Sequence, residues 1–298
     1  MPSHIPVLAT EVAELLQLKP GDVVVDATLG AGGHSSAILE KISPKGTLVG
    51  IDKDEDAIRI ASNNLSSFKP QSQLATVVGS YTALDSIFST ATKSWRCGKP
   101  DGILFDLGLS SLQLGGNRGF SFLEDAPLDM RFGEAEDLTA EIIINSYPVD
   151  KLADILWQFG EERDSRKIAK AIFEARRKER ITTTNELVDI VTKAKGGRKG
   201  RINPATLTFQ ALRIAVNDEL SAIMSALPIA IELLKPGGRL AVISYHSLED
   251  RIVKNIFRDA AKNEIVKLVT KKPTRPSFVE TKNNPRSRSA KLRVIEKI

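Results

Sequence analysis

The stretch Val23-Val24-Val25-Asp26-Ala27-Thr28-Leu29-Gly30-Ala31-Gly32-Gly33-His34 decides the fold of this chain. Its β-branched apolar run predicts a buried strand, and its glycine-rich turn lets the backbone approach a ligand closely. A second short strand, Val49-Gly50-Ile51-Asp52, ends in a carboxylate that can accept hydrogen bonds from two ribose hydroxyls. Together these features predict a nucleotide-type pocket at the carboxyl edge of a parallel sheet.

The spacing of the glycines separates two classes of cofactor. A dinucleotide-binding fingerprint requires a third glycine at position 35, where this chain has Ser35. The order of Asp26, Gly30, Gly32 and Gly33 instead resembles the first motif of S-adenosylmethionine-dependent methyltransferases. A tight strand-to-helix turn that binds no ligand is the structural alternative.

The amino-acid composition indicates a folded globular protein. The chain has 298 residues, 42% of them hydrophobic and 27% charged, which is ordinary for a folded globular protein. The single Cys97 excludes an internal disulfide and a cysteine-rich zinc site. No signal-peptide pattern and no apolar run of about 20 residues occurs, so we expect a soluble, cytoplasmic protein.

Positive charge is concentrated near the C-terminus. Residues 262–298 carry 11 Lys or Arg against 3 Asp or Glu, a balance of +8, although the whole chain is only +5. Lys271, Lys272 and Arg275 lie in this segment among proline and serine residues, which is typical of an exposed segment that contacts phosphates. A merely solvated tail is the alternative.

Strand and helix signals alternate through the first hundred residues, as a doubly wound α/β sheet requires. From about Leu112 the pattern becomes helical, and a long helix starting after Asn203-Pro204 is expected to run through Leu220. We therefore expect a methyltransferase domain at residues 1–112 and 204–298, interrupted by a helical insert at residues 113–203. The expected strands are Val23–Ala27, Thr47–Ile51, Leu74–Val78, Gly102–Asp106 and Arg239–Ser244, with a closing antiparallel hairpin of Ile265–Thr270 and Ala290–Glu296.

Polar residues follow the predicted strands at the edge where a ligand binds. Asp106 ends the fourth strand and Ser110 follows it. A carboxylate at this place can bind a cofactor amino group or accept a hydrogen bond from an acceptor amine. Tyr245 and His246 follow the fifth strand and are candidates for substrate contacts, with Ser247 as the expected helix cap.

Two further side chains have both a binding and a structural interpretation. Tyr81 can stack on an adenine ring or form the edge of the core. His34 can hydrogen-bond a ligand or cap the turn. The three histidines, His4, His34 and His246, have no metal-ligand spacing, so we expect no catalytic metal.

A set of motifs in order along the chain resembles the bacterial ribosomal RNA small-subunit methyltransferase H family. That resemblance implies a class I, Rossmann-like S-adenosylmethionine-dependent methyltransferase that modifies N4 of a cytidine in the decoding region of small-subunit ribosomal RNA. Its partner would be that RNA, within a ribosomal particle. The matching runs are Asp26 to His34, Gly50 to Asp52, Asp106 to Ser111, Gln113-Leu114, Arg118 to Phe122, Pro127 to Arg131, Gly160 to Arg163, Phe209 to Ile214, His246 to Arg251 and Asn284 to Arg286.

The resemblance also implies site residues. Cofactor contacts fall on Gly32, Gly33, His34, Asp52, Tyr81, Asp106 and Gln113, in addition to the Gly30 of the turn. Asp106 is the candidate catalytic residue. Tyr245 is a departure, because the family often has phenylalanine there. An amino-methyltransferase acting on DNA or another RNA, and a non-catalytic ribosome-assembly factor, are the alternative functions.

Overall fold

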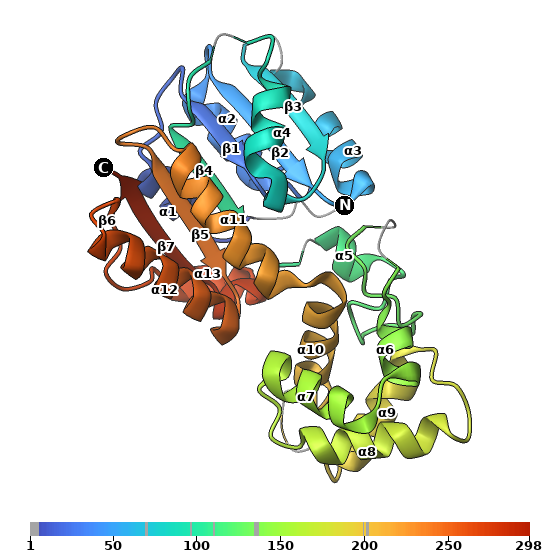
Figure 1. Cartoon of the computed structure of the whole chain (residues 1–298). Helices are drawn as coiled ribbons and strands as arrows, with labels where there is room; N and C mark the ends of the chain where they lie inside the picture. The colour runs from blue at the N-terminus through green and yellow to red at the C-terminus, as the bar shows by residue number, and fades with distance from the viewer. Residues whose placement is uncertain are drawn as a thin grey trace. The chain divides into compact units, whose positions relative to one another are not determined.

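The computed structural model describes residues 6–298 apart from residues 69–70, 96, 110, 134–136, 199 and 201–202. By its internal contacts the chain divides into two compact units, residues 1–110 with 220–298, and residues 111–219. The first unit holds the sheet, and the second is helical (Figure 1).

The sheet of the first unit has seven strands in the order β3-β2-β1-β4-β5-β7-β6. The first five strands in this order are parallel, whereas β7 runs antiparallel to both β5 and β6. The closing antiparallel hairpin that the sequence predicts is therefore confirmed. The strands are β1 (Val23–Asp26), β2 (Thr47–Asp52), β3 (Gln73–Val78), β4 (Gly102–Asp106), β5 (Arg239–Ser244), β6 (Val266–Leu268) and β7 (Lys291–Lys297).

The strand order reverses direction between β1 and β4. Chain order runs outward from β1 through β2 to β3, then restarts on the other side of β1 with β4 and β5. In open α/β sheets, the carboxyl ends of the strands at such a switch point form the ligand-binding crevice. Asp26 ends β1 and Asp106 ends β4, so both carboxylates lie at that edge.

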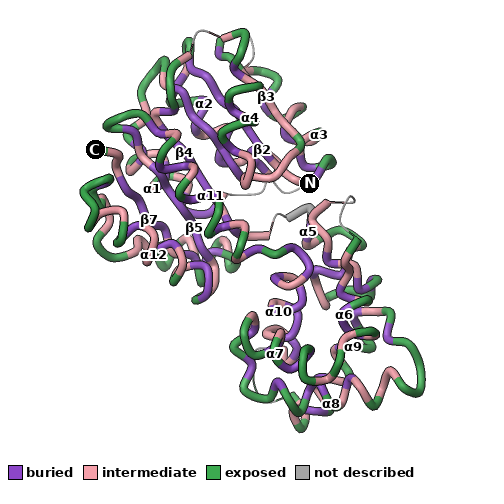
Figure 2. The backbone as a smooth tube through the Cα atoms, viewed as in Figure 1, coloured by how far each residue is buried: buried purple, intermediate pink, exposed green. Residues whose placement is uncertain are grey.

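Alternating residues of the strands pack into two separate hydrophobic layers. Val23 and Val25 join a core with α4, α11 and α12, whereas Val24 joins one with α1, α2 and α3. Figure 2 shows the central strands as buried backbone between more exposed helices. The helices of this unit are α1 (Ala9–Leu16), α2 (Gly33–Ile42), α3 (Glu55–Asn64), α4 (Leu84–Ala91), α11 (Glu219–Leu233, whose first residue belongs to the second unit), α12 (Ser247–Lys262) and α13 (Phe278–Asn283).

The second unit is built from helices, as the sequence predicts for this part of the chain. Gly160 at the end of α7 lies so close to α10 that an added Cβ would come within 2.6 Å of the Leu207 carbonyl oxygen. A capping box of Thr183 and Glu186 begins α9. The helices are α5 (Ser111–Gly115), α6 (Ala140–Ser146), α7 (Val149–Gly160), α8 (Ser165–Arg176), α9 (Thr184–Ala194) and α10 (Thr206–Asn217).

The long helix expected after Pro204 is two helices, so that expectation is wrong. Asp218 has φ +47°, a left-handed conformation that ends α10 before α11 begins. Because α10 packs on α7, it belongs to the helical unit, whereas the sequence-based boundary at residue 203 assigns it to the methyltransferase domain. Among the described residues no single helix is long and apolar enough to cross a membrane, and only α10 and α11 taken together reach that length and apolarity.

Candidate functional site

The glycine turn after β1 is held against the end of β2. Gly30 and Gly32 have φ of +52° and +84°, a region that side chains with a Cβ rarely adopt. The Gly30 backbone N–H donates to Asp52 Oδ2 over 2.8 Å. The turn thus brings its backbone beside the carboxylate predicted to bind ribose.

Asp52 ends β2 with its carboxylate fixed by backbone donors. Its Oδ1 accepts from the Asp54 N–H over 3.0 Å, which leaves lone pairs on both oxygens for further donors. Burial raises the pKa of Asp52 from 3.8 to about 6, against the lowering effect of these backbone hydrogen bonds. The side chain therefore titrates closer to neutral pH than an ordinary aspartate.

Asp26 stabilises the turn between β1 and α2 through hydrogen bonds. Its side chain is 1% exposed and accepts hydrogen bonds from Ser35 Oγ over 2.7 Å and from the Thr28 N–H over 3.2 Å. Burial raises its pKa. Ser35, which stands where a dinucleotide fingerprint has glycine, thus ties α2 to the end of β1.

Asp106 lies at the centre of a group of side chains from three elements. The Asp106 N–H donates to Thr28 Oγ1 over 2.6 Å, so the ends of β1 and β4 are joined. Its carboxylate Oδ1 accepts from the Tyr245 hydroxyl over 2.8 Å, and its Oδ2 lies 3.4 Å from His34 Nε2. We call Asp106, Tyr245 and His34 the Asp106 cluster.

His34 faces Asp106 from the first turn of α2, and the helix cap is Gly32. Its Nε2 is buried without a hydrogen-bond partner among the described residues, because the contact with Asp106 is an ion-pair distance without hydrogen-bond alignment. Burial lowers the pKa of His34, but Asp106 and the neighbouring Asp26 and Glu280 outweigh it, and the net direction is upward. A buried polar atom aimed at the predicted ligand edge favours the binding interpretation of His34 over the capping one.

The ring of Tyr245 packs against Gly108. A Cβ at position 108 would lie 2.5 Å from Tyr245 Cε2, so only glycine leaves space for the ring. Burial and the Asp106 carboxylate raise the pKa of Tyr245 well above 10, which keeps its hydroxyl protonated as a donor.

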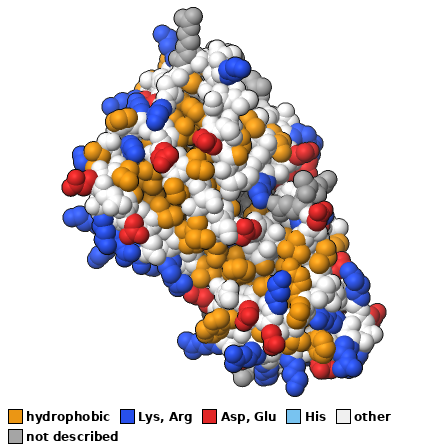
Figure 3. Space-filling model, viewed as in Figure 1, with side chains coloured by type: hydrophobic (Ala, Val, Ile, Leu, Met, Phe, Trp, Pro, Cys, Tyr) orange, Lys and Arg blue, Asp and Glu red, His pale blue; other side chains and the backbone are white. Residues whose placement is uncertain are grey.

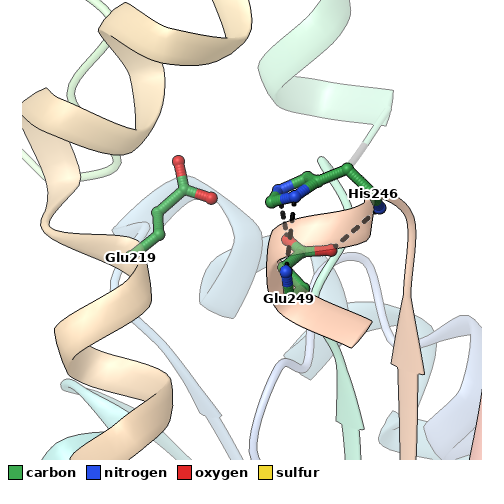
Figure 4. A group of neighbouring side chains, drawn as sticks. All are labelled: Glu219, His246 and Glu249. Atoms are coloured by element: carbon green, nitrogen blue, oxygen red, sulfur yellow. Dashed lines mark hydrogen bonds and ion pairs between the residues drawn. The ribbon is translucent and has the colours of Figure 1, made fainter. Parts of the chain in front are cut away.

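His246 caps α12, and the expectation that Ser247 is the cap is wrong. His246 Nδ1 accepts from the Glu249 N–H over 3.4 Å, and its Nε2 lies 3.0 Å from Glu249 Oε1 (Figure 4). The other Glu249 oxygen accepts from the Tyr245 N–H over 2.8 Å.

Glu219, also drawn in Figure 4, is the last residue of the second unit and accepts two hydrogen bonds from Arg213. The expectation of no catalytic metal stays a prediction.

The remaining predicted site residues lie in different parts of the chain. Tyr81 packs edge-on against Phe105, with ring centroids 5.5 Å apart, at the carboxyl end of β3. Gln113 is buried in the second unit, and Ser110 lies outside the described residues. Lys271, Lys272 and Arg275 are exposed in the loop between β6 and α13.

Two other basic residues of the C-terminal segment are structural. Lys291 and Arg293 on β7 pair with Asp250 on α12, at 3.1 Å and 2.7 Å. These ion pairs attach α12 to the sheet. The strong local charge of the segment is therefore divided between structural pairs and exposed cations.

Comparison with known proteins covers the whole chain. The model of the MraW methylase family matches residues 1–298. The chain belongs to this family. Among curated members, the ribosomal RNA small subunit methyltransferase H of Dehalococcoides mccartyi is 49% identical over 99% of this chain and 86% of its own length. The protein of the same name from Persephonella marina is 46% identical over the full length of both chains.

Solved structures of lower sequence identity also align with this family member. The structure of an rRNA methylase from Streptococcus thermophilus aligns with 97% of this chain and 93% of its own length, at 12% identity and a TM-score of 0.43.

Proposed function

We propose that this protein transfers a methyl group from S-adenosylmethionine to small-subunit ribosomal RNA, and that the acceptor is N4 of a cytidine in the decoding region. The observation that carries the proposal is the position of the Asp106 cluster beside the glycine turn and Asp52, at the switch point of the sheet. Full-length similarity to proteins named ribosomal RNA small subunit methyltransferase H supports the class of substrate.

The residues present fit an adenosine-containing cofactor. The Asp52 carboxylate has lone pairs left for two ribose hydroxyls. The glycines of the turn at Gly30 to Gly33 have no side chains that would keep a ligand from the backbone. Tyr81 follows the carboxyl end of β3. His34 Nε2 is a buried polar atom that still lacks a hydrogen-bond partner among the described residues. S-adenosylmethionine supplies an electrophilic methyl group when bound.

Asp106 is placed to act on the acceptor amine. Methyl transfer is an in-line displacement that depends on alignment and on charge stabilisation, and it needs no strong base. The Tyr245 hydroxyl donates to the Asp106 carboxylate, and the Asp106 backbone N–H donates to Thr28 Oγ1, so the residue is fixed at the end of β4. A carboxylate held there can accept a hydrogen bond from an exocyclic amine and help localise the nitrogen lone pair. It can also stabilise the positive charge that develops on that nitrogen.

Two basic regions are proposed as RNA contacts. The first is the loop that holds Lys271, Lys272 and Arg275. The second is in the helical unit, where residues 163–201 carry 13 Lys or Arg against 5 Asp or Glu. Arg166, Lys167 and Lys170 are exposed along α8, and Figure 3 shows basic side chains gathered at this end of the unit. We therefore assign RNA recognition to the insert as well as to the loop.

A turnover experiment tests the proposal. The protein is incubated with methyl-labelled S-adenosylmethionine and unmethylated small-subunit particles, with naked ribosomal RNA and DNA in parallel, and the modified nucleoside is identified by mass spectrometry. Label in N4-methylcytidine from the particles is the expected result and would also agree with a cytoplasmic location. Label only in DNA or in another nucleoside would support a different amino-methyltransferase. Particle binding without any label would support a non-catalytic assembly factor.

A further inference from the structure

Phe278 is an exposed aromatic residue at the start of α13. Its side chain is 84% exposed, and that of its neighbour Val279 is 65% exposed. Keeping a whole aromatic ring in water forgoes the stabilisation that burial of its apolar area would give. Such a ring marks a contact surface when its surroundings suit a partner.

The structure fixes α13 in place, so the ring is not carried on a loose tail. Ser277 caps the helix by accepting from the Glu280 N–H, and Glu280 Oε1 accepts from the Leu8 N–H over 2.7 Å. A Cβ added to Gly33 would lie 3.5 Å from Pro6, so the segment from Pro6 to Leu8 connects the glycine turn to α13.

The pKa values of His34 and Tyr245 agree with this position of α13 beside the glycine turn. Burial and Asp106 have the largest effects on the pKa values of His34 and Tyr245, and the charge of Glu280 is close enough to raise both. Phe278 lies two residues before Glu280 on the same short helix. The exposed ring therefore belongs to the helix that lies beside the glycine turn, on a different face of that helix from Glu280.

The surroundings of Phe278 are cationic. Lys282 follows it by four residues, on the same face of α13, and Arg275 precedes it by three. Both are exposed, and neither forms an ion pair with any residue that the structure describes. A second copy of this chain would bring like charges together here, whereas an RNA strand would supply phosphates of opposite charge.

We propose that Phe278 is a stacking residue for an unpaired base of the RNA substrate, next to the nucleotide that is methylated. This inference rests on the proposed function and adds to it a contact with a base. An enzyme that acts on a base amine needs its target strand unstacked, and an aromatic ring beside cations is the surface on which unstacked bases bind. Lys282 and Arg275 hold the phosphates on either side.

Substitution of Phe278 separates stacking from charge. Binding of a single-stranded RNA that contains 2-aminopurine is measured by its fluorescence across a salt series, together with S-adenosylhomocysteine affinity by calorimetry. For Phe278→Ala we expect RNA affinity to fall about tenfold, or about 1.4 kcal/mol. The slope of affinity against salt and the affinity for S-adenosylhomocysteine stay unchanged. Phe278→Trp restores affinity, Phe278→Leu does not, and the neighbouring control Val279→Ala stays within about twofold of wild type.

Three outcomes would overturn the inference. An RNA affinity of Phe278→Ala within about twofold of wild type would show that the ring does not stack. Full rescue by Phe278→Leu would show that only apolar area matters. Sedimentation in which Phe278→Ala dissociates a dimer, with RNA affinity intact, would assign the surface to a second copy of the chain. A wild-type protein that binds neither this RNA nor small-subunit particles would instead contradict the proposed function itself.

Discussion

The hydroxyl of Tyr245 donates a hydrogen bond of 2.8 Å to Asp106 Oδ1, although the two residues are 139 positions apart in the sequence. The contact joins the end of β5 to the end of β4. It occupies one carboxylate oxygen and leaves Oδ2 facing His34. Tyr245 is therefore a positioning residue that sets the orientation of Asp106, and Gly108 provides the space for its ring.

We expect Tyr245→Phe to fold normally and to lower kcat by about three- to tenfold, because one hydrogen bond to a charged group is lost. The affinity for S-adenosylhomocysteine stays within about twofold of wild type, since the glycine turn and Asp52 are unchanged. Single-turnover rates measure the first effect and calorimetry the second. Tyr147→Phe, in the helical unit, is the matched control.

We also expect Tyr245→Phe to raise the pKa of His34. Loss of the Tyr245 donor concentrates the negative charge of Asp106, so the pKa of His34, already raised by that carboxylate, rises further. The protonated imidazole then persists to higher pH. NMR titration of the His34 ring protons in wild type and Tyr245→Phe measures this. An unchanged His34 titration would show that Tyr245 does not act through Asp106.

Asp106→Asn preserves the size of the side chain and removes its charge. We expect turnover at saturating cofactor to fall by more than about tenfold, because the group that stabilises charge on the acceptor nitrogen is lost. Asp85→Asn, on the exposed first turn of α4, is the control of equal charge change. Wild-type single-turnover rates in Asp106→Asn, combined with weaker cofactor binding, would restrict Asp106 to a role in binding.

The sequence predicts the sheet well because each central strand is a short apolar run that ends in a polar residue. The sequence alone therefore assigns Asp52, Asp106 and Tyr245 to one edge of the sheet. The contacts among Asp106, Tyr245 and His34 could not be predicted, because they depend on register and on the space left at Gly108.

The start of α12 and the break between α10 and α11 differ from the sequence-based predictions for physical reasons. The rules for helix caps favour serine, but the Nδ1 of His246 accepts the same hydrogen bond, so the cap is one residue earlier than expected. The break at Asp218 has no glycine to mark it. The helix α13 did carry a signal, because Ser277 and Glu280 have the spacing of a cap and its third helical residue.

The pKa of Asp52 predicts how cofactor binding depends on pH. A pKa raised from 3.8 to about 6 favours the folded free protein at low pH, and this contribution is lost as the pH rises through about 6. Cofactor binding needs the ionised carboxylate, so we expect S-adenosylhomocysteine affinity to increase between about pH 5 and about pH 7. Calorimetry at several pH values tests this. The difference between wild type and Asp52→Ala isolates Asp52, because His34 titrates in both proteins.

At neutral pH we expect Asp52→Ala to bind S-adenosylhomocysteine about tenfold to about a thousandfold more weakly, from the loss of two hydrogen bonds to a charged acceptor. Thermal unfolding checks that the variant is folded. Near-native affinity in a folded Asp52→Ala protein would contradict the ribose assignment.

Charge reversal in the loop before α13 tests the electrostatic contact with RNA. If Lys271, Lys272 and Arg275 each contact a phosphate, their replacement by glutamate flattens the slope of log affinity against log salt by about 2 and weakens binding to small-subunit particles. Cofactor affinity stays unchanged, because the loop does not include the glycine turn or Asp52. Lys19→Glu with Lys41→Glu and Lys45→Glu is the matched control, since it makes the same change in net charge in exposed residues near the amino ends of β1 and β2. Equal slopes for the two triple variants and wild type would show that the loop is merely solvated, and RNA binding would then be assigned to α8 and the rest of the helical unit.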